Sequence, residues 1–356
     1  MDSYRPQLDS LRAFAVGAVL LAHFWLPQLH FSTFGVRLFF VLSGFLLTTI
    51  LLRERRDAEV VGLSKGVLLK DFYVRRILRI WPAYYAAIVG VVLMGSSSVE
   101  DTFAWHALFA SNILFFQQQQ WYPPVTSHLW TLSVEEQFYL LLPIVILFLP
   151  QRRLRTVFAV CIATAIAYRA MVAITVTGML DFYYLLPVAQ LDALGGGALL
   201  ALIQHQDGAI DWKRLLSWSL PLTVLLYVLP LPIGFDFTVA LAMLILPLAA
   251  IVAAANAGVG GLAGAILSSR PLVALGRISY GIYLYHLFVA IAFNKAAISL
   301  GYPELSGPLA FVLFSFLTIL VAAASWFVLE RPALSLRRHF MRATKAPVIP
   351  AAPTAV

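Results

Sequence analysis

Two ionisable residues, Arg12 and His23, stand in the first apolar stretch of the chain, LDSLRAFAVGAVLLAHF. They are eleven positions apart, and eleven residues of an α-helix return to within about 20° of the same face. Their separation along the helix axis is roughly 16 Å, about half a bilayer core. An ionisable side chain at that depth is costly and by default marks a functional site. A neutral imidazole can act there as a general base or a nucleophile; the alternative is a histidine that only hydrogen-bonds a neighbouring helix.

The composition indicates an integral membrane protein. The 356 residues are 61% hydrophobic and 12% charged, against about 25% charged residues in a soluble domain. The mean hydropathy is +0.86. The formal net charge of +8 predicts no nucleic-acid partner, because membrane proteins concentrate Lys and Arg in their cytoplasmic loops. The single cysteine, Cys161, excludes an intramolecular disulfide and a cysteine-based metal site, and we predict no metal ion.

Apolar stretches long enough to cross a bilayer recur about ten times, which predicts an all-α, polytopic membrane protein. We place these spans near residues 11–29, 34–52, 78–95, 133–150, 156–177, 185–204, 215–230, 237–256, 274–299 and 307–329.

The distribution of basic residues predicts the orientation. With the N-terminus inside, all of the 25 Lys and Arg residues except Arg37, Arg169 and Lys295 fall on inner segments. The positive-inside rule therefore places both termini in the cytoplasm. We expect a retained first span, one integral-membrane domain over residues 1–340, and a disordered cytoplasmic tail over 341–356.

A basic, amphipathic segment, SKGVLLKDFYVRRILRIWPAYY, leads into the third span. Its exposed lysines, Lys65 and Lys70, are expected to pair with anionic membrane lipid. Arg76 and Arg79 are three residues apart at the mouth of the span, so they share a face and form a forked donor for phosphate.

The longest outer loop, about residues 96–131, is rich in aromatic and amide side chains, including Trp130. Such side chains suit a sugar, although an aromatic belt at the membrane interface explains Trp and Tyr equally well. Glu135 and Glu136 follow just below the outer surface, and adjacent helical positions differ by 100°, so one of them can face a cavity. Further along, Arg169 and Asp192 are expected to form a structural ion pair.

Taken together, the motifs resemble acyltransferase family 3, the integral-membrane O-acyltransferases of bacterial envelope glycans and some macrolides. The matching segments, in the family's order, are LDSLRAFAVGAVLLAHF, FGVRLFFVLSGFLLT, RRILRIWPAYY, HLWTLSVEEQFYLLLP, LDALGGGALLA, LGRISYGIYLYH and ERP. One position departs: the resemblance leads us to expect an arginine two residues before Asp192, where Gln190 stands.

The resemblance implies transfer of an acyl group, usually acetyl from acetyl-coenzyme A, to a sugar hydroxyl of an envelope or exported polysaccharide. It also implies a multi-pass protein of the bacterial inner membrane. We expect no appended esterase-like domain of the kind that some family members have, so either a single protein carries the whole reaction or it passes the acyl group to a separate periplasmic partner.

We assign roles on this basis. The catalytic candidates are His23, Glu135 and Glu136, and Glu135 rather than Glu136 is expected to orient His23 or the sugar hydroxyl. The donor phosphates are assigned to four arginines, Arg12, Arg76, Arg79 and Arg277. The carbohydrate acceptor is assigned to Trp130, Tyr283 and His286.

Several alternatives stay open at this stage. His23 can be a general base or a covalent acyl carrier, and it is expected to be buried in apolar surroundings that keep it neutral. The acceptor can be an exopolysaccharide, lipopolysaccharide, peptidoglycan or a macrolide, and the acyl group can be longer than acetyl. A proton-coupled secondary transporter is the rival class, since intramembrane His, Glu, Asp and Arg also form proton relays. A third interpretation is a protein with a purely structural role, but it does not explain why Arg12 and His23 share one helix face.

Overall fold

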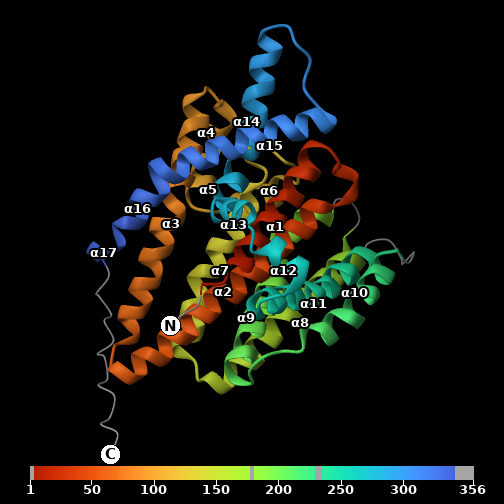
Figure 1. Ribbon diagram of the computed structural model, residues 1–356. Coiled ribbons are helices and arrows are strands. Elements are labelled where there is room, and N and C mark those ends of the chain that lie inside the picture. The colour runs from red at the N-terminus through yellow and green to blue at the C-terminus, as the bar shows by residue number, and fades with distance from the viewer. Residues whose placement is uncertain (1–3, 177–179, 229–234, 341–356) are drawn as a thin grey trace, which may run out of the picture.

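The computed structural model describes residues 4–176, 180–228 and 235–340, and over this part of the chain it contains helices and no strand (Figure 1). The all-α prediction is confirmed. The predicted disordered tail, 341–356, lies outside the described residues. The longer helices are α1 Pro6–Phe24, α2 Phe31–Val61, α3 Lys65–Leu93, α7 Leu129–Phe148, α8 Gln151–Thr175, α9 Pro187–Gln206, α10 Trp212–Val228, α11 Phe235–Ala257, α14 Ser279–Ser299 and α15 Gly307–Ser325.

Short helical segments connect these helices. They are η1 Pro27–Leu29, α4 Ser97–Asp101, α5 Phe103–Ala107, α6 Ser111–Gln118, η2 Pro124–Thr126, η3 Leu180–Leu185, α12 Gly261–Leu267, α13 Arg270–Arg277, η4 Trp326–Glu330, α16 Arg331–Ser335 and α17 Arg337–Phe340.

Eight helices of the described chain are long and apolar enough to cross a membrane. They are α2, α3, α7, α8, α9, α11, α14 and the continuous helical stretch that begins with α15. The other two predicted spans correspond to α1, whose first half is polar, and to α10, which has only 17 residues. A multi-pass membrane protein is therefore supported, whereas the count of ten spans and the cytoplasmic placement of both termini stay predictions.

Three boundaries differ from the sequence prediction. The first span begins earlier and ends at Phe24, because Pro27 disfavours helical conformation at the residue before it. The basic segment and the third span form one continuous helix, α3, capped by Ser64, whose side chain accepts a hydrogen bond from the backbone N–H of Val67. The predicted ninth span is divided at Ile278 into α13 and α14.

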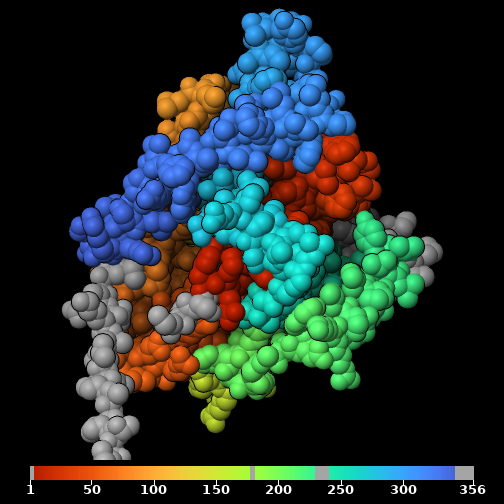
Figure 2. All heavy atoms as spheres, viewed as in Figure 1, coloured from red at the N-terminus to blue at the C-terminus, as the bar shows by residue number. Residues whose placement is uncertain are grey.

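Helix α1 lies at the centre of the fold. It packs against α2, α11, α12, α13, α14 and α15. Figure 2 shows α12 and α13 (cyan) and the C-terminal helices (blue) covering most of α1 (red) on the face in view. The first half of α1 is fixed by hydrogen bonds, since the side chain of Gln7 bonds both backbone groups of Val259 and Ser10 donates to the carbonyl of Leu267 at 2.6 Å.

The most extensive helix packing joins α2 to α9. The two backbones are so close that a Cβ atom added at Gly44 would lie 2.0 Å from the carbonyl oxygen of Leu194. A Cβ atom at Gly197 would lie 2.1 Å from the carbonyl oxygen of Val41. The glycines of LDALGGGALLA thus permit the close approach of helices that small residues typically allow in membranes.

A buried ionic cluster lies at one end of the same interface. Asp192 of α9 accepts a hydrogen bond from Arg37 of α2 at 2.7 Å and a second one from Arg169 of α8. The side chains of all three residues are at most 2% exposed. The predicted pairing of Arg169 with Asp192 is confirmed. Gln190, at the position where the family resemblance suggested arginine, also accepts from Arg37, at 3.4 Å.

This packing makes Gly44→Ala strongly destabilising. The added methyl group must push two helix backbones apart, and overpacking of this kind costs about 1–3 kcal/mol. Gly17→Ala is the matched control, because nothing lies within 4 Å of a Cβ atom added there. The control should be neutral or stabilise the protein by up to about 1 kcal/mol. Thermal unfolding of both variants in one detergent checks the difference, and equal melting temperatures would contradict it.

Candidate functional site

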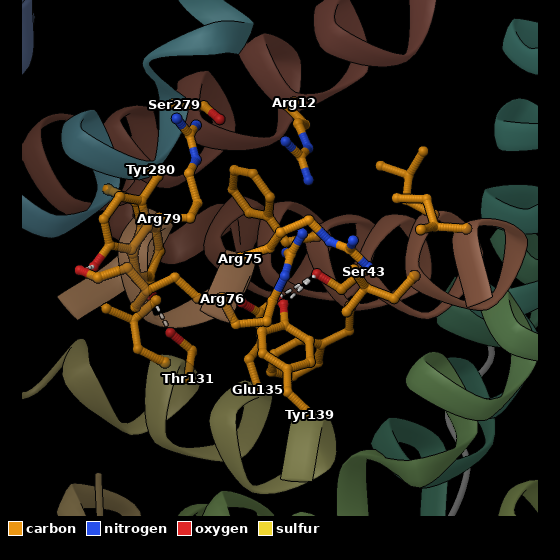
Figure 3. A pocket seen from close by; sticks show the side chains of 18 of the residues that line it. Arg12, Ser43, Arg75, Arg76, Arg79, Thr131, Glu135, Tyr139, Ser279 and Tyr280 are labelled. Atoms are coloured by element: carbon orange, nitrogen blue, oxygen red, sulfur yellow. Dashed lines mark hydrogen bonds between the residues drawn. The ribbon is translucent and has the colours of Figure 1, made fainter. Parts of the chain in front are cut away.

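A cavity of about 380 Å³ lies among α1, α2, α3, α7, α14 and the C-terminal helices. We call it the arginine cavity, because five arginines line it: Arg12, Arg75, Arg76, Arg79 and Arg337. Figure 3 shows the side chain of Arg12 reaching it from α1, opposite those of Arg75, Arg76 and Arg79 from α3. Arg12 and Arg76, which lie 64 positions apart in the sequence, thus line the same cavity, as a donor site formed by both residues requires.

Two of these arginines are partly neutralised. Arg75 forms an ion pair with Glu54 at 2.7 Å. Arg79 lies 3.5 Å from the buried carboxylate of Glu330, and its guanidinium stacks over the Trp326 ring, 4.8 Å from the centroid. Arg79 therefore has a structural partner that the sequence analysis did not foresee.

Arg12 and Arg76 carry charge that no carboxylate of the described chain pairs with. Arg76 lies near the rings of Phe72 and Tyr139, and its Nε atom is buried without a hydrogen bond. Unpaired guanidinium groups in a cavity bind anions with several oxygens, phosphates above all, because their planar fork matches that geometry.

A polar group lies on the opposite wall of the arginine cavity. Ser43 of α2 donates a hydrogen bond to Glu135 of α7 at 2.7 Å, and Tyr139 donates to Ser43 at 3.0 Å (Figure 3). Glu135 was predicted to orient His23 or an acceptor hydroxyl, but it lies with the arginines and contacts Ser43 instead. Its neighbour Glu136 lines neither this cavity nor the one described next, since it lies 100° around the helix.

Arg277 was predicted to bind the donor phosphates, but it does not line the arginine cavity. Its side chain is 57% exposed and stacks on Tyr4, 5.2 Å from the ring centroid. Its backbone carbonyl, however, accepts a hydrogen bond from Arg79 at 3.0 Å. Arg277 thus supports the arginine cavity through its backbone, while its guanidinium lies outside the lining.

A second cavity, of about 520 Å³, lies beyond the first along α2. We call it the histidine cavity, because His23, His30 and His128 line it. Trp121 and Trp130 also line it, so the predicted acceptor residue Trp130 lies with His23. His23 lines this cavity with an exposed side chain.

His23 is held by His286. The Nδ1 atom of His23 lies 2.7 Å from Nε2 of His286, and the planes of the two rings differ by only 6°. The Nδ1 atom of His286 in turn lies 2.5 Å from the backbone carbonyl oxygen of Tyr283. His286 is fully buried, so it contacts His23 from behind instead of lining the cavity as an acceptor-binding residue would.

The two cavities share two lining residues, Val36 of α2 and Tyr283 of α14. The Tyr283 hydroxyl accepts a hydrogen bond from Thr131 at 2.7 Å and donates one to the carbonyl of His128 at 3.2 Å. Its side chain therefore stands fixed at the junction. A molecule that extends through the arginine cavity to this wall would present its end to the histidine cavity.

The structure thus brings Arg12, Arg76 and Arg79 together and places His23 and Trp130 in a separate, adjoining space. Sequence reasoning missed Ser43, Arg75, Arg337 and His128 as lining residues. No sequence signal pointed to Ser43, because serine and glycine are common at helix interfaces in membranes. His128 could have been noticed as a histidine at the start of the acidic motif.

Comparisons with known proteins agree on one family. Residues 5–327 match the family model of an acyltransferase domain. The chain is 30% identical, over 92% of its length, to a protein of Bacillus subtilis (strain 168) named "Putative peptidoglycan O-acetyltransferase YrhL", of which it covers 55%. It is 27% identical, again over 92% of its length, to the O-acetyltransferase OatA of Staphylococcus aureus (strain NCTC 8325 / PS 47), of which it covers 57%. The chain spans about half the length of these curated relatives, and no solved structure matches it.

Proposed function

The chain belongs to this acyltransferase family, and we propose that it transfers an acetyl group from cytoplasmic acetyl-coenzyme A to a sugar hydroxyl of a cell-envelope glycan. The observation that carries the proposal is the junction of the two cavities at Val36 and Tyr283. Unpaired guanidinium groups lie in one cavity and an exposed imidazole in the other. Donor and acceptor can therefore meet without sharing a binding site.

Coenzyme A suits the arginine cavity. Its pyrophosphate and its 3′-phosphate are polyanionic, and Arg12 and Arg76 offer charges that no protein carboxylate neutralises. Its pantetheine arm is long and narrow and carries amide groups, for which Ser43, Glu135 and Thr131 provide hydrogen-bonding partners along the cavity wall. The acyl end of the arm would then lie at Val36 and Tyr283. A longer acyl group than acetyl is compatible with the same binding mode.

The positive-inside rule supports a cytoplasmic opening for the arginine cavity. The start of α3 and the C-terminal helices are rich in Lys and Arg, and α16 and α17 pack against α3. Lys65 and Lys70 are exposed on α3, where we place anionic lipid headgroups against them. In this orientation the protein lies in the bacterial inner membrane and the histidine cavity faces outward.

We assign the histidine cavity to the carbohydrate acceptor. Aromatic rings with hydrogen-bonding neighbours provide the stacking and polar contacts that a sugar needs, and Trp121, Trp130 and Gln190 meet this description. The name of the Bacillus subtilis relative favours peptidoglycan as the glycan. A glycoside such as a macrolide is the second candidate acceptor. A separate periplasmic partner for the acyl group stays a prediction.

His23 acts in this proposal as the general base. Its imidazole takes the proton of the sugar hydroxyl, and the alkoxide oxygen attacks the thioester carbonyl carbon. The new C–O ester bond forms, the C–S bond breaks, and the proton passes to the departing coenzyme A thiolate. A secondary transporter, the rival interpretation of the sequence, is not favoured, because the chain belongs to a family of acyltransferases.

Arg76→Lys should weaken acetyl-coenzyme A binding about tenfold, or roughly 1.4 kcal/mol, because lysine keeps the charge but cannot copy the bidentate fork. Arg277→Lys is the matched control, since the guanidinium of Arg277 lies outside the arginine cavity. Calorimetric titration of both purified variants measures the two affinities. Equal affinities for the two variants would argue against the arginine cavity as the donor site.

Glu135→Gln should reduce acetyl transfer by about tenfold, whereas Glu136→Gln should have a mild effect. The reason is that Glu135 borders the arginine cavity and holds Ser43, and a charge-assisted hydrogen bond is worth about 1.5–3 kcal/mol. Turnover of acetyl-coenzyme A with a glycan acceptor measures the ranking. The reverse ranking would mean that the functional face of α7 has been assigned incorrectly.

His23→Ala tests the activity itself. General-base catalysis typically contributes about 10² to 10⁴ in rate, so the variant should lose nearly all transfer while still binding acetyl-coenzyme A. Transfer, donor affinity and thermal stability should be measured on the same purified protein. In cells, a deletion strain complemented with this variant should lack the glycan acetylation that the parent gene restores. A well-folded His23→Ala protein with near wild-type transfer would refute the proposed function.

A further inference from the structure

Three histidines from different elements lie together at one wall of the histidine cavity: His23 and His128 line it, and His286 lies behind them. The ring centroid of His286 lies 4.9 Å from that of His23 and 4.8 Å from that of His128. The other rings around His286 belong to Phe24 and Tyr283. No carboxylate of the described chain forms an ion pair or a hydrogen bond with any of these histidines.

The proton positions on His286 follow from its partners. A backbone carbonyl can only accept, so Nδ1 of His286 must carry the proton that it shares with the oxygen of Tyr283. A second proton, on Nε2, would make His286 a cation that is fully buried and has no carboxylate partner. Such a buried charge is expensive, so His286 is neutral and its Nε2 atom is an acceptor.

The same reasoning fixes the proton on His23. Its Nδ1 atom lies 2.7 Å from an acceptor, so Nδ1 must donate. The other ring nitrogen, Nε2, then holds the lone pair, and it makes no hydrogen bond within the described chain. Because the His23 side chain is exposed to the histidine cavity, this lone pair is open to a bound acceptor.

We propose that His286 is a positioning residue that fixes the tautomer of His23, with the proton on Nδ1 and the basic lone pair on Nε2. This inference rests on the proposed function, in which His23 takes the proton of the acceptor hydroxyl. A free imidazole interconverts between two tautomers, and only one of them presents the basic nitrogen to the cavity. The hydrogen-bond chain from Tyr283 through His286 selects that one before the acceptor binds.

Two substitutions of His286 separate this role from a merely structural one. His286→Gln places a side-chain oxygen where Nε2 stands, so it can still accept the proton of His23. His286→Asn can still donate to the Tyr283 carbonyl, but it is too short to reach His23. Both replace a buried aromatic ring by a smaller amide, so their effects on packing are similar. They differ mainly in the acceptor offered to His23.

We expect His286→Gln to keep kcat near the wild-type value and His286→Asn to lose on the order of 10²-fold, the lower range of a general-base contribution. The KM for acetyl-coenzyme A should stay unchanged in both variants, since neither touches the arginine cavity. Steady-state kinetics with melting temperatures provide this comparison. Equal kcat values for two variants of equal stability would overturn the inference.

Nitrogen-15 spectra of the histidine-labelled, full-length protein give a second readout that needs no substrate. The His23 resonances are identified by their loss in His23→Asn. The wild-type protein and His286→Gln should show His23 protonated on Nδ1, whereas His286→Asn should show a mixture of tautomers. A wild-type His23 protonated on Nε2 would also overturn the inference, even if neither His286 variant folds. Because the spectra are independent of transfer, failure of the proposed function can be told apart from failure of this inference.

Discussion

The contact on which the site depends is the close approach of α2 to α9. Gly44 and Gly197 let the two backbones come into contact, so α2 is held along one side against α9. The ion cluster around Asp192 fixes the same pair near one end, where breaking it would leave arginines buried without compensation. Because α9 covers one side of α2, another side of α2 can line the two cavities.

Helix α2 lines both cavities. Thr33 and Val36 line the histidine cavity, and Val36, Ser43, Leu47 and Ile50 line the arginine cavity. These positions are three, four or seven residues apart, which places them on a single helix face. The single helix α2 thus runs along both cavities, and Tyr283 of α14 lines the junction with it.

We could predict the helical class and most span positions from the length of the apolar stretches. We could also predict that Arg12, Arg76 and Arg79 lie together, because charged residues are rare in apolar helices and the spacing of Arg76 and Arg79 places them on one helix face. It also placed Arg169 with Asp192. It could not reveal that Glu330 pairs with Arg79, since they come from helices about 250 residues apart.

The sequence also could not show which partners the polar residues of α7 and α13 contact on neighbouring helices. Helix spacing alone does not distinguish Glu135 from Glu136, and only the family resemblance favours Glu135. The orientation of α7 places Glu135 in hydrogen-bond contact with Ser43. Arg277 contributes its backbone carbonyl, which accepts a hydrogen bond from Arg79, whereas its guanidinium lies outside the arginine cavity. Motif spacing predicts which face of a helix a residue occupies, whereas the partner across the interface depends on how the helices pack.

The junction of the two cavities at Val36 and Tyr283 has an electrical consequence. If the two cavities open to opposite sides of the membrane, a water-filled passage between them would let ions leak and dissipate the stored gradient, which is worth about 2.3 kcal/mol per charge for each 100 mV. The side chains of Val36 and Tyr283 line both cavities, so a seal at this point would have to exclude water and still let the two reacting atoms approach to about 3 Å. In the proposed transfer, the acyl group would change sides while the membrane stays sealed, because a covalent bond, and no solvent, has to cross.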